Sequence, residues 1–210
     1  MRGHFITFEG GEGSGKTSVI NSLSKHLSNL GYEVVVTREP GGIGIAEQIR
    51  DIILSKNNIE MDQLTEAYLF AASRRQHLVE RVIPEIEEGK IVLCDRFLDS
   101  SIVYQGYARG IGMDKVYEIN KVVIDEFMPD LTLFFDVKPE VGLRRIAENL
   151  RDVNRLDLED KNFHNKVYEG YKILTERFKT RIKVVNGEQT IDNVRRDAIK
   201  VLEEFLNDSK

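Results

Sequence analysis

The feature that most restricts the fold of this chain is a glycine-rich segment close to its start. Residues 10–17 read Gly-Gly-Glu-Gly-Ser-Gly-Lys-Thr and fit the pattern G-x-x-x-x-G-K-[ST]. The segment follows a mostly apolar run, residues 5–8, and precedes apolar residues at helical spacing, residues 19–27. Glycines allow successive backbone N–H groups to turn toward one anion, and the start of a helix adds its positive dipole end. The sequence therefore predicts a strand, a phosphate-binding loop and a helix, in that order.

Lys16 and Thr17 close the pattern with the side chains that triphosphate binding needs. A lysine here reaches the β- and γ-phosphates, and the threonine hydroxyl holds Mg²⁺. A glycine-rich turn that matches by chance is the alternative, and the flanking strand and helix argue against it. The pattern indicates a nucleoside triphosphate without saying what is done with it. The expected triphosphate-binding residues are Gly10, Gly11, Glu12, Gly13, Ser14, Gly15, Lys16 and Thr17.

Strand-like and helix-like stretches alternate along the rest of the chain. The expected strands are residues 4–9, 33–37, 90–95, 131–137 and 182–186. The third and fourth are nearly continuous apolar runs, which is typical of strands buried on both faces of a parallel sheet. A long helical region spans residues 61–88, where Pro84 is expected to end or kink it, and Pro139 is expected to start another helix. The alternation predicts an α/β fold with a doubly wound parallel sheet, in which ligands bind at the carboxyl ends of the strands.

Length and charge limit the classes of protein to be considered. The chain has 210 residues, which suits a single domain, residues 1–210, with a full hydrophobic core. Its net charge of −5 provides no general field for nucleic acid, so we expect no nucleic-acid partner. One cysteine, Cys94, cannot form an intramolecular disulfide. No signal peptide or membrane span is recognisable, and we expect a cytoplasmic protein with no membrane partner.

Two polar segments follow predicted strands and are therefore expected at the same edge of the sheet. Arg38 and Glu39, in the glycine-rich segment 37–42, suit a phosphate and Mg²⁺ site, although a solvated turn would look the same. Arg96 presents a planar fork that matches a phosphate. Asp95 could hold Mg²⁺ or its waters, or orient Arg96; the alternative is a buried Asp–Arg pair that only caps the strand.

Two further clusters have equally plausible structural explanations. Phe70 and Arg74 lie four residues apart and share a helix face, where they could stack on and hydrogen-bond a flat base; Phe70 could equally be core and Arg74 solvated. Residues 144–155 carry four arginines against two acidic residues. This segment predicts a mobile lid near residues 144–157 that closes over a phosphate site, with a solvated polar helix end as the alternative.

Taken together, these segments resemble the bacterial thymidylate kinase family along essentially the whole chain. Residues 8–17 are similar to its phosphate loop, residues 37–42 to a characteristic second segment, residues 70–75 to its nucleobase helix and residues 93–105 to its signature. Phe97 stands where the family more usually has tyrosine. The resemblance implies the three-layer P-loop nucleoside monophosphate kinase fold, with a parallel five-stranded sheet flanked by helices. It also implies ATP and dTMP as substrates, Mg²⁺ as cofactor, dTDP as product and a homodimer.

The same resemblance implies roles for the clustered side chains. Phe70 would stack on thymine and Arg74 would donate to a thymine carbonyl. Tyr104 would fill the space of a ribose 2′-hydroxyl, and Glu12 would accept from the sugar 3′-hydroxyl. The implied dTMP-binding residues are Glu12, Arg38, Glu39, Arg50, Phe70, Arg74, Arg96, Ser101, Tyr104 and Gln105.

In the bacterial subclass that the chain resembles, the catalytic arginine comes from the lid. The phosphate loop here contains no arginine, and the lid offers Arg151 and Arg155, between which the sequence does not decide. Thr17 and Asp95 are the implied metal-site residues. The implied catalytic residues are Lys16, Arg96, Arg151 and Arg155.

Two other functions are compatible with the phosphate loop. One is another P-loop nucleoside monophosphate or deoxynucleoside kinase, which would differ in the residues around the base. The other is a nucleotide-switched binding protein, but the sequence contains neither an N-K-x-D base motif nor a D-x-x-G switch motif.

Overall fold

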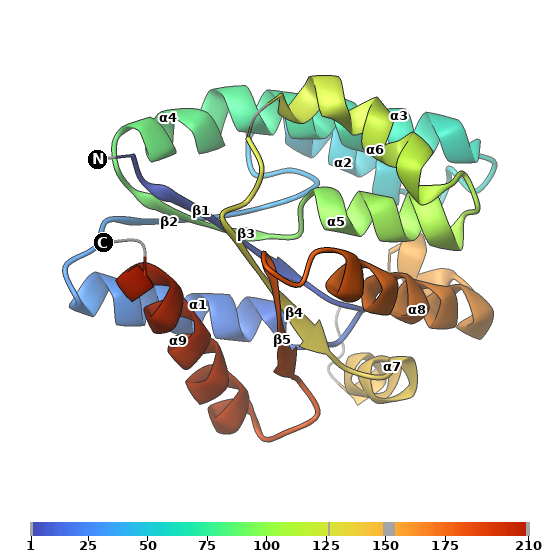
Figure 1. Ribbon diagram of the computed structural model, residues 1–210. Coiled ribbons are helices and arrows are strands. Elements are labelled where there is room, and N and C mark those ends of the chain that lie inside the picture. Colours follow the sequence, from blue (N-terminus) through green and yellow to red (C-terminus); the bar gives the residue numbers. More distant parts are fainter. Residues whose placement is uncertain (1, 126, 149–153, 209–210) are drawn as a thin grey trace.

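The chain forms a parallel five-stranded sheet between layers of helices, as the alternating pattern predicts (Figure 1). The structure is a computed structural model and describes residues 2–125, 127–148 and 154–208. The strand order is β2-β3-β1-β4-β5. The strands are β1 (His4–Glu9), β2 (Val34–Arg38), β3 (Ile91–Asp95), β4 (Leu131–Asp136) and β5 (Ile182–Asn186). Each lies within one residue of its predicted bounds at either end.

The register of the sheet brings the polar strand ends together. Asp95 at the end of β3 is the Cα partner of Phe8 in β1 on one side and of Arg38 in β2 on the other. The loops that follow these three strands therefore leave the sheet at the same edge. This is the edge at which parallel α/β sheets bind ligands.

Helices cover both faces of the sheet. They are α1 (Lys16–Asn29), α2 (Gly44–Leu54), α3 (Gln63–His77), α4 (Ile83–Glu87), α5 (Leu98–Ser101), α6 (Met113–Ile124), α7 (Pro139–Glu148), α8 (Lys161–Arg177) and α9 (Ile191–Asp208). α1 and α9 pack on the face that presents Ile6, Phe8 and Leu133. α4, α5, α6 and α8 lie on the opposite face, over Phe5 and Phe134 (Figure 1).

Two π-helical segments interrupt the ordinary helices on this second face. Leu78–Val82 joins α3 to α4, and Ile102–Ala108 continues α5. The sequence predicts that Pro84 ends or kinks the helical region, and of these two outcomes an end is not seen, because the chain stays helical to Glu87. The π-helical turn restarts the hydrogen-bond pattern, so Pro84 falls in the first turn of α4, where its missing N–H is not needed. None of the helices in the described ranges is long and apolar enough to cross a membrane.

Candidate active site

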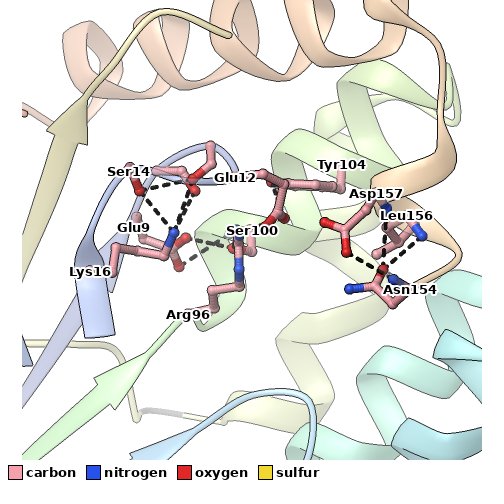
Figure 2. A network of polar contacts seen from close by, with 12 residues as sticks. Glu9, Glu12, Ser14, Lys16, Arg96, Ser100, Tyr104, Asn154, Leu156 and Asp157 are labelled. Carbon is pink, nitrogen blue, oxygen red and sulfur yellow. Dashed lines mark hydrogen bonds and ion pairs between the residues drawn. The ribbon is translucent and has the colours of Figure 1, made fainter. Parts of the chain in front are cut away.

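The phosphate-binding loop lies between β1 and α1, as predicted. Gly10, Gly13 and Gly15 have positive φ values of 147°, 68° and 87°, which side chains with a Cβ rarely adopt. The loop carries its own cation inside. Lys16 Nζ donates to Gly10 O (3.0 Å), Gly11 O (3.1 Å) and Ser14 Oγ (3.0 Å), and Figure 2 shows it folded toward the loop.

Burial makes the charge of Lys16 easy to lose. Its side chain is buried, and this desolvation, with the neighbouring Arg96 charge, lowers the pKa of Lys16 to about 8. An anion placed in the loop would oppose both effects, because it is a negative charge close to the ammonium group. The loop is therefore prepared for a phosphate by a buried cation.

Thr17 and Asp95 meet at the start of α1, where the sequence predicts a metal site. The Thr17 hydroxyl donates to Asp95 Oδ2 at 2.9 Å. Hydroxyl and carboxylate oxygens are hard donors of the kind that Mg²⁺ prefers, and Mg²⁺ in such sites is held by a few protein oxygens together with phosphate oxygens. The residues present thus fit a magnesium ion that arrives with a nucleotide.

Arg96 links the end of β3 to the phosphate loop. Its guanidinium donates to Glu12 Oε1 at 2.7 Å, and its carbon Cζ lies 5.1 Å from the centre of the Tyr104 ring. The Tyr104 hydroxyl also donates to Glu12 Oε1, at 3.2 Å. Arg96 has a φ of 68°, an uncommon conformation for a residue other than glycine. Its backbone N–H donates to Phe8 O at 3.0 Å, so the neighbouring strand holds this strained conformation in place.

A buried carboxylate, Glu9, supports Arg96 from below. Its oxygens accept from Phe97 N (2.7 Å), Ser100 Oγ (2.6 Å) and the Tyr171 hydroxyl (2.8 Å). Burial and the charge of Asp99 raise the pKa of Glu9 to about 7, against the opposing effects of Arg96 and of these hydrogen bonds. Glu9 thus ties the end of β1 to the start of α5 and to α8, and Figure 2 shows its contact with Ser100.

These groups surround a cavity of about 620 Å³ at the carboxyl edge of the sheet. This volume is within the range of small-molecule sites. Phosphate-loop side chains line one part of it, and Phe70, which is 9% exposed, lines another together with Tyr104 and Gln105. The predicted site residues in its wall are Glu12, Gly13, Ser14, Gly15, Lys16, Thr17, Arg38, Glu39, Arg50, Phe70, Asp95, Arg96, Tyr104 and Gln105.

The sequence profile of the thymidylate kinase family matches residues 8–198. This chain belongs to the thymidylate kinase family. The thymidylate kinase of Oceanobacillus iheyensis is 56% identical to it, over 100% of this chain and 94% of that protein. The thymidylate kinase of Clostridium novyi is 60% identical, over 92% of this chain and 95% of that protein. A crystal structure of thymidylate kinase from Ehrlichia chaffeensis has a TM-score of 0.77 and 35% sequence identity, and covers 96% of this chain and 99% of that one.

The structure places Arg74, one of the predicted base-binding residues, behind the cavity wall. Arg74 is 1% exposed and is not among the residues that line the cavity, and neither is Ser101. The guanidinium of Arg74 donates to Glu39 Oε2 (2.9 Å), Asn120 Oδ1 and Ser101 Oγ (3.1 Å). Arg74 thus joins the predicted residues Glu39 and Ser101 into one buried network.

The remaining predicted residues of the acceptor side lie near the end of β2. Arg50 donates to Pro40 O at 2.8 Å, and Arg38 donates to Glu47 Oε1 at 2.6 Å. Glu39, besides holding Arg74, accepts from His77 Nδ1 at 3.0 Å. The predicted cluster at 37–42 is therefore built into the site rather than left as a solvated turn.

Of the two predicted lid arginines, the structure describes only Arg155. Arg151 lies outside the described residues. Arg155 is buried, is not in the cavity wall, and donates to Glu66 Oε2 and to Ile53 O (2.9 Å). Its backbone N–H donates to Leu54 O at 3.2 Å. In this arrangement Arg155 attaches the C-terminal end of the predicted lid to α2 and α3.

Some residues in or near the site were not predicted from the sequence. Glu9 could have been found, because a carboxylate that ends an apolar strand just before the phosphate loop must lie at the ligand edge. The same argument applies to Gly187, Gln189 and Ile191, which follow β5 and line the cavity. Glu66 gave no comparable signal, because it lies inside a helix and its partners are distant in sequence.

Proposed function

We propose that this chain transfers the γ-phosphoryl group of ATP to dTMP, giving dTDP for the synthesis of dTTP. Family membership supports the reaction, and one observation supports its location: a single cavity is lined both by the phosphate loop with Lys16 and by the aromatic ring of Phe70. A triphosphate and a nucleobase can thus be held in one cavity. This arrangement is what direct transfer between two nucleotides requires.

On the donor side, the loop 10–17 would surround the phosphates of ATP, with Lys16 on the β- and γ-phosphates. Thr17 and Asp95, 2.9 Å apart, would hold Mg²⁺ or its waters. When bound, Mg²⁺ neutralises phosphate charge and fixes the orientation of the triphosphate. The short contact between the two side chains supports this assignment, since both face the space beside the loop.

On the acceptor side, we assign the dTMP phosphate to Arg96, Arg38 and Arg50. Arg96 is held from two directions, by Glu12 and by the backbone of Phe8, which suits a group that must position an anion. Phe70 would stack on the thymine, while Arg74, behind the cavity wall, would hold Glu39 and Ser101 in place through its hydrogen bonds. The acceptor is already an ionised phosphate oxygen, so the reaction needs no general base.

We also propose that the chain is a single domain whose lid, near residues 144–157, closes during the reaction. Since Arg155 is engaged with Glu66 and the backbone of Ile53, we assign the arginine that reaches the transferred phosphoryl group to Arg151. Closure would exclude water, which otherwise competes for the phosphoryl group.

A coupled ADP-release assay tests the proposed reaction with dTMP, dUMP, dCMP, AMP and thymidine. We expect ADP release to depend on a monophosphate, with dTMP fastest. The thymine methyl group contributes about 1–3 kcal/mol, so dUMP should be a slow but measurable substrate. Faster turnover of AMP or of thymidine would identify a different P-loop kinase, and steady hydrolysis without an acceptor would identify a nucleotide switch. Lys16→Ala should abolish transfer while the protein remains folded.

A homodimer that buries the outer faces of α2, α3 and α6 is the assembly we propose. The support is a set of exposed apolar side chains on these helices: Ile45, Ile52, Tyr68 and Val122. Sedimentation analysis of the protein and of a Val122→Asp variant tests it, because a monomer in both cases would contradict the proposal.

We further assign the chain to the cytoplasm, where a nucleotide kinase meets its substrates, and cell fractionation checks this.

A further inference from the structure

Glu66 is a buried carboxylate behind the proposed base pocket. It lies in α3, is 1% exposed, and precedes Phe70 by four residues, so both side chains share one face of the helix. Three side chains from distant parts of the chain donate to it. They are Gln105 (Nε2 to Oε1, 2.9 Å), Arg109 (Nε to Oε1, 3.3 Å) and Arg155 (Nη2 to Oε2).

The charge of Glu66 is secured by these neighbours. Burial alone would raise its pKa, but Arg109, the Gln105 amide and Arg155 together hold the pKa of Glu66 below its ordinary value. At neutral pH the group is therefore a carboxylate. A carboxylate only accepts hydrogen bonds, so every group that faces it must present a donor.

This restriction decides which way the Gln105 amide points. Gln105 lies in the π-helical segment Ile102–Ala108, is 1% exposed, and lines the cavity. Its Nε2 must face Glu66, because its carbonyl oxygen would be repelled there. The carbonyl oxygen Oε1 occupies the other corner of the planar amide and is thereby left for the cavity.

We propose that Glu66 is a specificity-determining residue that fixes the Gln105 amide so that a hydrogen-bond acceptor faces the base. This rests on the proposed function and on the implied place of Gln105 among the dTMP-binding residues. Thymine and uracil carry an N–H donor at ring position 3, and cytosine carries a lone pair there. If the Gln105 amide cannot rotate, its oxygen accepts from the N–H of thymine or uracil and repels the lone pair of cytosine.

The experiment compares kcat/KM for dTMP with kcat/KM for dCMP in the full-length enzyme. In Glu66→Gln, the side chain at position 66 can donate or accept, so the Gln105 amide can turn its N–H toward the cytosine lone pair. We expect the dTMP-to-dCMP ratio to fall roughly tenfold, the size of one net hydrogen bond to a buried partner. Glu159→Gln is the matched control, because Glu159 is the second carboxylate on Arg109 and does not touch Gln105, and it should leave the ratio unchanged.

Gln105→Ala separates a failure of this inference from a failure of the proposed site. If Gln105→Ala leaves the ratio unchanged, Gln105 does not contact the base, and both its proposed role and the inference are wrong. If Gln105→Ala lowers the ratio and Glu66→Gln does not, only the inference is overturned. Absence of dTMP turnover in the unaltered enzyme would instead reject the proposed function.

Glu66→Gln leaves Arg155 without its carboxylate and could prevent folding. The charge-balanced variant Glu66→Gln/Arg155→Gln removes that buried charge and provides the same test of amide orientation. Its control, Arg155→Gln alone, should lower kcat for dTMP and dCMP by the same factor, because it loosens the lid attachment without freeing Gln105. An equal fall of the ratio in Arg155→Gln and in the double variant would overturn the role of Glu66.

Discussion

The affinity of the free enzyme for Mg·ATP should fall steeply as pH rises from 8 to 9.5, because Lys16 loses its proton in that range. Its pKa of about 8 follows from burial first and from the Arg96 charge second. At pH 9 only about a tenth of the molecules would carry the charge, against about 97% for a lysine of ordinary pKa. The apparent Kd should therefore rise about tenfold per pH unit above 8.

Bound triphosphate should reverse the effect on Lys16. One phosphate charge at about 4 Å and an effective dielectric constant of about 20 stabilises the ammonium group by about 4 kcal/mol. Since a pKa unit corresponds to about 1.36 kcal/mol, this returns the pKa of Lys16 to its ordinary value or above. Binding at pH 9 should accordingly take up close to one proton, and kcat should decline only at a higher pH than affinity does.

Isothermal titration calorimetry in buffers of different ionisation enthalpy measures both quantities, the Kd and the number of protons taken up. Lys16→Arg is the matched control, because arginine stays protonated throughout and should give a flat, though weaker, affinity profile. A Kd that is constant between pH 7.5 and 9, without proton uptake, would show that the three loop acceptors offset the burial of Lys16 completely. The protonation of Lys16 also affects stability. Between pH 8 and 10.5 this lysine is largely protonated in the unfolded chain and largely neutral in the folded one, so it makes the free energy of unfolding rise with pH.

Two substitutions test the geometry of the site. Phe70→Ala should raise the KM for dTMP on the order of tenfold while changing the KM for ATP little, because we propose that this cavity-lining ring stacks on the thymine; equal changes in initial-rate kinetics would make Phe70 a packing residue. Gly142→Ala places a Cβ 2.1 Å from Glu12 O, so urea unfolding should show a loss of about 1–3 kcal/mol and kcat/KM should fall for both substrates. Gly44→Ala, where a Cβ meets nothing within 4 Å, is its control, and similar behaviour of the two variants would contradict the close contact between α7 and the loop.

The fold was predictable because each strand is specified by its own residues. Apolar runs bounded by polar or glycine-rich turns gave all the strands, and parallel pairing then required their carboxyl ends to share one edge. Asp95 and Arg96 were found by this rule, and the phosphate loop was found by its own motif. The structure follows this rule, because Phe8 is paired with Asp95, and Asp95 with Arg38, at the carboxyl ends of three neighbouring strands.

The partners of buried charges were not predictable in the same way. Arg155 and Glu66 are 89 positions apart, and their pairing depends on how α3 packs against the C-terminal end of the predicted lid. Sequence spacing identifies which side chains share a helix face, but it does not say which distant charge will neutralise them. An arginine in a basic, weakly periodic segment was therefore equally compatible with a catalytic role and with a structural one.

Burial separates these roles on energetic grounds. The guanidinium of Arg155 is buried and paired with a carboxylate. Breaking this ion pair would leave two unpaired charges in the protein interior, which costs several kcal/mol. A catalytic arginine must instead approach and leave the phosphates in every cycle. Arg96, held by Glu12 at the cavity wall, meets an incoming phosphate by exchanging one anion for another and needs no such separation. Paired arginines at the wall are thus suited to substrate binding, and paired arginines beneath it are suited to fixing the parts of the chain that must not move.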